Sequence, residues 1–271
     1  MIVQHNMSAA NTNRQLAITN GNLAKSTEKL SSGYKVNRAA DNAAGLTISE
    51  KMRGQIRGLD QASTNAQDGI SLVQTAEGAL AETESILQRM RELAVQAAND
   101  TNVTADRAAI SEELSSLEAE IDRIGSQTEF NTMKLLDGSF TNKNLQVGAN
   151  ANQNISIQIS AMTVAGLSAS IKGKVDTYSK ATGAISQIAK SISRVSTQRS
   201  KLGAIQNRLE HTIANADNTS ENLQSAESRI RDVDMAEEMV KYSKDSILQQ
   251  AGQSMLAQAN QATQGILSLI R

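Results

Sequence analysis

The sequence predicts a mainly α-helical fold: an elongated antiparallel helical bundle, or coiled coil, with one small β-hairpin. Three observations support this prediction. The 271 residues contain no proline, where average usage would supply about 13, so the strongest interrupter of helices is missing. Apolar residues recur every seven positions, or at alternating spacings of three and four, through most of the chain. One stretch of alternating residues, LQVGANANQNISIQI, separates these runs and is typical of a hairpin.

Both ends of the chain carry narrow apolar stripes with helical spacing. The N-terminal stripe consists of Leu16, Leu23 and Leu30, and the C-terminal stripe includes Leu248, Met255 and Leu269. Burying one leucine contributes roughly 1.5 to 3 kcal/mol, whereas ordering each backbone residue costs about 1 to 2 kcal/mol. We therefore expect residues 1–35 and 236–271 to be poorly ordered in the isolated chain and to fold on association with other copies.

Two further apolar series predict a pair of antiparallel helices. The first runs from Met52 to Ala94 with a period of seven. Turn-forming residues from Asn99 to Thr104 then predict a reversal, with Thr104 as the N-cap and Asp106 in the first turn of the next helix. That helix carries the second series, which comprises Ile110, Leu114, Leu117, Ile121 and Ile124.

A third long helix is predicted nearer the C-terminus. Its apolar series extends from Ile185 to Ile230, and the polar residues Arg199 and Gln206 interrupt it. The region between the second and third series, about 141–178, differs in character. It contains the predicted hairpin, whose alternating apolar residues are Leu145, Val147, Ile155, Ile157 and Ile159. Residues 160–178 show no clear period and are expected to form a loop or a short helix.

A polar, glycine-containing junction precedes the first long helix. Gly33 and Gly45 are expected to relax the limits on the backbone, and Asp41 and Asn42 to cap a helix that begins near Ala43. A plain loop with an N-cap explains part of this pattern. The density of polar residues also favours contacts made during assembly.

Composition argues against several classes of function. The net charge of -1 gives no electrostatic reason to expect a nucleic-acid or membrane partner. Without cysteine, and with only His5 and His211, a metal site or a catalytic triad is improbable. The acidic residues from Asp232 to Glu238 suit the start of a helix without a metal. We expect no enzyme activity and no cofactor, and the N-terminus does not resemble a cleavable signal peptide.

Several motifs resemble those of bacterial flagellins. The stretch LAKSTEKLSSGYKVNRAADNAAGLTISEKM resembles the N-terminal signature of that family, and LQRMRELAVQAANDT resembles its first long helix. EIDRIGSQTEFNTMKLLDG follows at the expected place. AESRIRDVDMAEEM and the ending ILSLIR complete the C-terminal pattern. The resemblance therefore covers nearly the whole chain.

The resemblance implies a division into two domains. Residues 1–40 and 235–271 would form an inner domain of paired terminal helices with a spoke that contains Gly33, Asp41, Asn42 and Gly45. Residues 41–234 would form a helical-bundle domain with the hairpin. Only about forty residues separate Gly138 from Tyr178, so the variable outer domains of larger flagellins are expected to be absent.

The resemblance also implies a function and partners. The protein would be a structural subunit, exported through the flagellar secretion system, that polymerises into an extracellular helical filament used for motility. An export chaperone would bind the C-terminal segment 248–271, and the filament cap and hook-associated proteins would be further partners. The family's Toll-like receptor site would correspond to Arg89, Leu93 and Glu113. Arg89 and Leu93 are four residues apart and are expected to share a helix face displaced from the seam, where a neighbouring subunit would also make contact.

Two other classes of protein are alternatives to flagellin. The hook–filament junction protein shares the terminal pattern but does not polymerise indefinitely. A signalling coiled coil, such as the cytoplasmic hairpin of a chemoreceptor, would have continuous heptads and a membrane anchor. The match at 87–101 favours flagellin over the first, and the predicted β-hairpin argues against the second.

Overall fold

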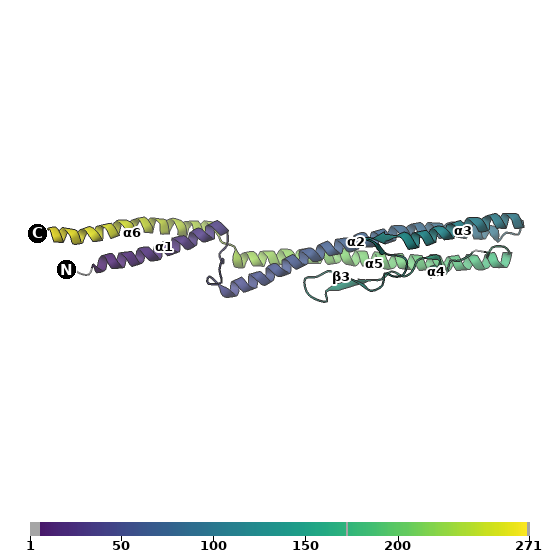
Figure 1. The fold of residues 1–271 in the computed structure, drawn as a ribbon, viewed down its shortest axis with the longest axis horizontal. Coiled ribbons are helices and arrows are strands. Elements are labelled where there is room, and N and C mark those ends of the chain that lie inside the picture. The colour runs from purple at the N-terminus through teal and green to yellow at the C-terminus, as the bar shows by residue number, and fades with distance from the viewer. Residues whose placement is uncertain (1–5, 172, 270–271) are drawn as a thin grey trace. The chain divides into compact units, whose positions relative to one another are not determined.

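The computed structural model describes residues 6–171 and 173–269, and over these ranges the chain is mainly α-helical (Figure 1). Six helices occur there. They are α1 (Met7–Ser32), α2 (Ala43–Ala97), α3 (Thr104–Gln127), α4 (Val164–Leu167), α5 (Tyr178–Arg231) and α6 (Met235–Leu269). Within the described ranges, no helix is both long and apolar enough to cross a membrane. The predicted fold class, an antiparallel helical bundle with a small hairpin and paired terminal helices, is confirmed.

The chain divides into two compact units. The central unit is Gln55–Glu221, and the terminal unit combines Met1–Gly54 with Asn222–Arg271. The sequence-based division was placed instead at 40/41 and 234/235. In the structure, the first residues of α2 and the last residues of α5 therefore group with the terminal helices.

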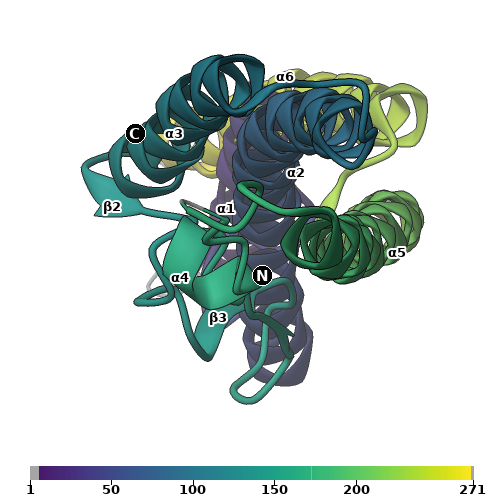
Figure 2. The same ribbon diagram turned by 90° about the vertical axis from the view of Figure 1, so that its right-hand side faces the viewer.

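In the central unit, α3 and α5 lie on either side of α2 (Figure 2). Polar pairs show that α5 runs antiparallel to α2: Ser63 Oγ donates to Asp217 Oδ1 over 3.1 Å, and Ser220 Oγ donates to Asp60 Oδ1 over 3.0 Å. The predicted apolar series meet in the core between these helices. Its largest fully buried side chains are Leu80, Leu87, Met90, Leu114, Ile121, Leu135, Leu136, Ile159, Leu167, Ile171, Ile188 and Leu202.

The predicted hairpin is present as β3 (Lys143–Gln146) and β4 (Asn154–Ile157), which pair antiparallel with Leu145 opposite Ile155. A second, shorter hairpin was not predicted. It pairs β1 (Glu129–Phe130) with β2 (Met133–Lys134) around Asn131 and Thr132, which both have positive φ angles of 48° and 63°. Strands of two residues are too short to display an alternating pattern, so the sequence carries no such signal for them.

The segment from residue 158 to 171, here called the strap, covers one side of the bundle and contains α4. Asp122 of α3 accepts a hydrogen bond from the Val164 N–H at 2.8 Å, and Ser191 of α5 donates to the Leu167 carbonyl at 3.0 Å. The strap is thus fastened to two helices by polar side chains. This agrees with the expected loop or short helix.

In the terminal unit, α1 and α6 lie side by side (Figure 1) and run antiparallel. A hydrogen bond of 2.7 Å joins the buried Ser26 hydroxyl to Glu238 Oε1, and Asn6 Nδ2 donates to the Ala259 carbonyl at 3.0 Å. Leu16, Leu23 and Leu30 are half-buried. The N-terminal stripe therefore faces the pairing helix, in part as the sequence predicted.

The described residues of the C-terminal stripe do not pair with α1, and their role in assembly stays a prediction. Leu248 and Met255 are 46% and 59% exposed. The half-buried face of α6 instead includes Gly252, where an added Cβ would lie 3.2 Å from Leu16 Cδ1. A small residue lets α1 approach this face closely, so the helix pairs there and not along its larger apolar side chains. The Leu269 side chain lies outside the described residues, and the order of both ends in the isolated chain stays a prediction.

Candidate functional site

The junction between α1 and α2 is held by backbone pairing with the connection between α5 and α6. Gly33 ends α1 with a φ of 75°, and its N–H donates to the Lys29 carbonyl at 2.9 Å. The Val233 N–H donates to the Gly33 carbonyl at 3.1 Å, and the Lys35 N–H donates to the Arg231 carbonyl at 2.6 Å. The left-handed conformation favours glycine, so the expectation for Gly33 is confirmed.

The roles of the other three junction residues, Asp41, Asn42 and Gly45, differ in part from those predicted. Asn42 caps α2, because its Oδ1 accepts the Gly45 N–H at 2.9 Å. Asp41 does not cap the helix. Its Oδ2 accepts the N–H groups of Arg38 and Asn37 at 3.0 and 3.2 Å, and these hydrogen bonds hold the pKa of Asp41 below its ordinary value. The expectation that Asp41 helps to cap α2 was therefore wrong.

Glycine is required at position 45 by the space around it and not by its backbone conformation. It lies inside α2, and positive φ angles occur among the described glycines only at Gly33, Gly138 and Gly173. A Cβ at this position would stand 2.7 Å from Asn42 Nδ2 and 3.0 Å from its Cγ. Glycine leaves room for the capping side chain, a role that the sequence pattern could not distinguish from a flexible backbone.

The three residues of the predicted receptor and assembly contact are not equivalent in the structure. Arg89 of α2 and Glu113 of α3 are exposed and form an ion pair, with Nη2 3.0 Å from Oε1, and Arg89 Nη1 lies 3.1 Å from Glu92 Oε2. Hydrogen bonds to Glu113 and then to Glu92 raise the pKa of Arg89. These two carboxylates hold the guanidinium at the surface between the helices.

Leu93 is only 2% exposed and belongs to the core. The expectation that it shares an accessible face with Arg89 was wrong. Because α2 packs against α3 on one side and α5 on the other, its apolar face is wider than a two-helix seam. Met90, Ala94 and Ala97 are buried with it.

A groove runs beside this cluster between α2 and α3, with a volume of about 560 Å³. We call it the acidic groove. Its lining includes Ala79, Glu82, Ile86, Glu120, Arg123 and Ile124. Arg123 pairs with Glu120, and that contact lowers the pKa of the Glu120 carboxyl. Glu82 makes no ion pair with any residue that the structure describes. The sequence alone does not reveal this groove, because it depends on how two helices meet.

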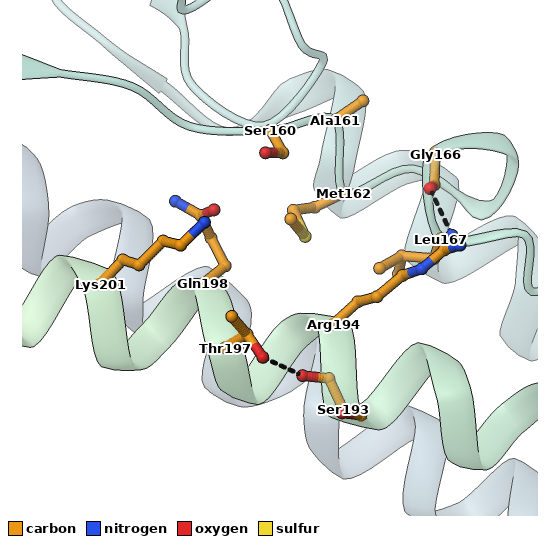
Figure 3. Close-up of a pocket in the computed structure, with 10 residues that line it drawn as sticks. All are labelled: Ser160, Ala161, Met162, Gly166, Leu167, Ser193, Arg194, Thr197, Gln198 and Lys201. Carbon is orange, nitrogen blue, oxygen red and sulfur yellow. Dashed lines mark hydrogen bonds between the residues drawn. The ribbon is translucent and has the colours of Figure 1, made fainter.

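A second hollow, of about 350 Å³, lies between α5 and the strap (Figure 3). Arg194 Nη1 donates to the Gly166 carbonyl and to Ser168 Oγ, each at 3.2 Å. The side chains of Gln198 and Lys201 extend from α5 toward the strap (Figure 3). The hollow thus combines an apolar floor, which includes Met162, with two cationic side chains.

The polar interruption at Arg199 connects α5 to α2. Arg199 Nη1 lies 2.5 Å from Glu84 Oε2, and Nη2 lies 3.6 Å from Glu77 Oε1. The hydrogen bond to Glu84 is the main cause that raises the pKa of Arg199. Since Glu77 and Glu84 are one heptad apart, the arginine spans two turns of α2 and marks the pairing register.

Over the described residues, one face of α6 has no partner in the terminal unit. Val240 and Ile247 are 70% and 66% exposed, and with Leu248 and Met255 they form what we call the exposed α6 face.

Asp234 caps the N-terminus of α6, because its Oδ1 accepts the N–H groups of Ala236 and Glu237. Over the described part of the chain, no group of three His, Cys, Asp or Glu residues could hold a metal ion.

Comparisons with known proteins agree with these features. The family model for the bacterial flagellin N-terminal helical region matches residues 3–141, and that for the C-terminal helical region matches residues 185–270. The chain is 55% identical to a flagellin of Halalkalibacterium halodurans and 49% identical to a flagellin of Bacillus subtilis. Each of these alignments covers 100% of both chains.

A solved structure from Vibrio parahaemolyticus, assigned to the flagellar hook-associated class, is similar with a TM-score of 0.61. The similarity covers 71% of this chain and 100% of that one at 12% identity, so it concerns the fold alone. The fold is therefore shared with that protein, and the full-length sequence identity to flagellins decides the family. This chain belongs to the bacterial flagellin family, whose members are structural subunits of the flagellar filament.

Proposed function

We propose that copies of this flagellin join in the filament through the exposed α6 face, with each copy contacting the next through unlike surfaces. The observation that carries the proposal is the division of α6 into two faces. One face pairs with α1, while Val240, Ile247, Leu248 and Met255 remain exposed. Contacts between unlike surfaces whose rotation does not close build open helical polymers.

The test is seeded polymerisation of purified chain. Replacing Ile247 and Leu248 by serine removes two exposed apolar side chains, and we expect filament growth from seeds to be lost or to need about tenfold more protein. A matched control replaces Ser243 and Gln250, exposed polar residues of the same helix, by asparagine and should leave growth unchanged. Normal growth of the serine variant, seen by electron microscopy, would contradict this assignment.

The remaining functional proposals follow from membership of the family. The chain is exported unfolded through the flagellar secretion system and acts outside the cell as a non-enzymatic subunit. Before export, a chaperone covers the segment 248–271, which includes part of the exposed α6 face. The filament cap and hook-associated proteins contact the ends of the polymer. The apolar side chains at Leu248 and Met255 support the need for a chaperone, because exposed apolar surface favours unwanted association.

A second use, receptor binding by the monomer, is proposed for Arg89 and Glu113. Their exposed ion pair supports it, and Leu93 acts as packing beneath Arg89 and not as a contact residue. We expect Arg89→Ala to weaken binding to a Toll-like receptor at least fivefold. Arg123→Ala is the matched control, because Arg123 also pairs with a glutamate on the same surface. Unchanged binding of the Arg89 variant, measured by surface plasmon resonance, would overturn this second use.

A further inference from the structure

In the central unit, basic residues are concentrated in the first part of α5 and acidic residues in α3. From residue 178 to residue 209, α5 contains six cationic residues and no acidic one; they are Lys180, Lys190, Arg194, Arg199, Lys201 and Arg208. By contrast, α3 contains six acidic residues, Asp106, Glu112, Glu113, Glu118, Glu120 and Asp122, and two basic ones, Arg107 and Arg123. A net charge near zero for the whole chain conceals this separation.

Four of the cations form a row on the outside of α5. Lys190, Arg194, Lys201 and Arg208, here called the basic row, are all exposed, and their spacings of four and seven place them on one helix face. Among the described residues none of the four makes an ion pair, and Arg194 bonds only to a carbonyl and a hydroxyl group. Neighbouring like charges four apart destabilise a helix. An anionic partner would remove that cost.

The acidic groove and the basic row lie at the same level of the bundle. The clamp of Arg199 on Glu77 and Glu84 places residue 199 of α5 beside this stretch of α2. Lys201 is close to this clamp in sequence, and the acidic groove is lined by the same stretch of α2, Ala79 to Ile86. Since α3 and α5 lie on either side of α2 (Figure 2), the acidic groove borders this segment of α2 on its α3 side, and the basic row belongs to the helix on its other side.

We propose that the basic row of one copy docks against the acidic groove of a neighbouring copy in the filament. The two surfaces have opposite charge and lie on different sides of α2, as a repeating contact between unlike surfaces requires. The acidic groove also has the half-buried apolar side chains of Ile86 and Ile124 between its charges.

Charge reversal and its compensation test the pairing. We expect K190E/K201E and E82K/E120K each to raise the critical concentration for seeded polymerisation by about tenfold or more. The chain that carries all four changes has opposite charges facing one another again, and its critical concentration should return to within about threefold of the unaltered chain. Thermal unfolding followed by circular dichroism checks that every variant is folded.

The control for net charge is K51E/K143E, which makes the same change at exposed lysines outside the basic row. Unchanged polymerisation of K190E/K201E would overturn the proposal. So would a loss in both double variants that the fourfold variant fails to reverse, because the basic row would then have another partner. The exposed α6 face is intact in all these chains, so failure here leaves that assignment standing.

The absence of cysteine from the chain allows a direct check by cross-linking. Filaments grown from an equal mixture of K201C and E82C chains should form a covalent dimer under mild oxidation or with a short bis-maleimide. Filaments of either variant alone should not, since a contact between unlike surfaces never brings two copies of one residue together. K143C mixed with E82C is the matched control. Dimers in the single-variant filaments, or none in the mixture, would overturn the pairing.

Discussion

The central and terminal units solve the problem of burying apolar side chains in different ways. In the central unit, α2 packs against helices on two sides, and Leu80, Leu87 and Leu202 are fully buried within one chain. In the terminal unit, α1 and α6 pair with one another, and among their described residues Leu23 is half-buried and Ile247 is exposed. A helix pair cannot enclose its apolar side chains as three helices can. We therefore predict that the central unit is stable in the monomer and that the terminal unit requires other copies.

The largest expected effect is a difference between the two units in the loss of stability when a leucine is replaced by alanine. Leu80→Ala should lower the free energy of unfolding of the monomer by about 2 to 5 kcal/mol, because it opens a cavity in a closed core. Leu23→Ala should cost the monomer about 1 kcal/mol or less, since this side chain is only partly removed from water. Denaturant unfolding followed by circular dichroism measures both. Equal losses would contradict the proposed difference between the units.

A smaller effect is expected from the polar link in the central unit. Arg199→Met should lower the free energy of unfolding by roughly 1 to 3 kcal/mol, because Glu77 and Glu84 lose their cation while partly shielded from water. Adding Glu77→Gln and Glu84→Gln to that variant should recover much of the loss, since no uncompensated charge remains. If the triple variant is no more stable than Arg199→Met, the clamp acts through packing and not through charge.

Replacing glycine by alanine at two positions of α2 in the terminal unit should change the stability in opposite directions. Gly54→Ala should stabilise the helix by up to about 1 kcal/mol, because a Cβ there meets no atom within 4 Å. Gly45→Ala should instead be less stable than Gly54→Ala by about 1 to 2 kcal/mol, because its Cβ displaces the capping side chain of Asn42. Thermal unfolding of the two variants compares them directly. Similar melting temperatures would show that the cap adjusts freely.

The smallest expected effect depends on pH. The pKa of Asp41 lies below its ordinary value of 3.8, because the carboxylate accepts two backbone N–H groups. A lowered folded-state pKa stabilises the protein at pH values above the unfolded-state pKa, and this contribution is lost as the pH falls through the folded-state value. Asp41→Asn should therefore be less stable at neutral pH and differ little from the unaltered chain in strong acid. A difference that persists in strong acid, where the carboxyl is protonated in both the folded and the unfolded state, would exclude the carboxylate charge as its origin.

Much of the fold could be predicted because long helices repeat their pattern many times. The series of α2, α3 and α5 were visible in the sequence, and the structure begins α2 at Ala43, as expected. The reversal before α3 was placed within one residue: Thr104 is the first helical residue, Val103 is the N-cap, and Asp106 Oδ2 accepts the Val103 N–H at 3.1 Å. The β1–β2 hairpin was missed because strands of two residues are too short to show a repeating pattern of apolar and polar residues.

The candidate sites were predicted less well, because one position in a pattern has several possible neighbours. Leu93 was expected at the surface, yet it is buried in the core. Leu248 and Met255 were expected to form an assembly stripe, and they are exposed, whereas Gly252 on another face of α6 lies against α1. In both cases the period identified a helix correctly. It could not show which of its faces the partner helix covers.

The sequence by itself determined the helices, the β3–β4 hairpin and the family, because local periodicity and motifs are properties of consecutive residues. Only the tertiary structure decided how the junction residues divide their roles, which side chains of α2 are buried, and where opposite charges gather. These depend on distances between segments far apart in the chain. Glu82 and Glu120 meet in one groove because α2 and α3 run antiparallel. Their separation in sequence does not indicate this proximity.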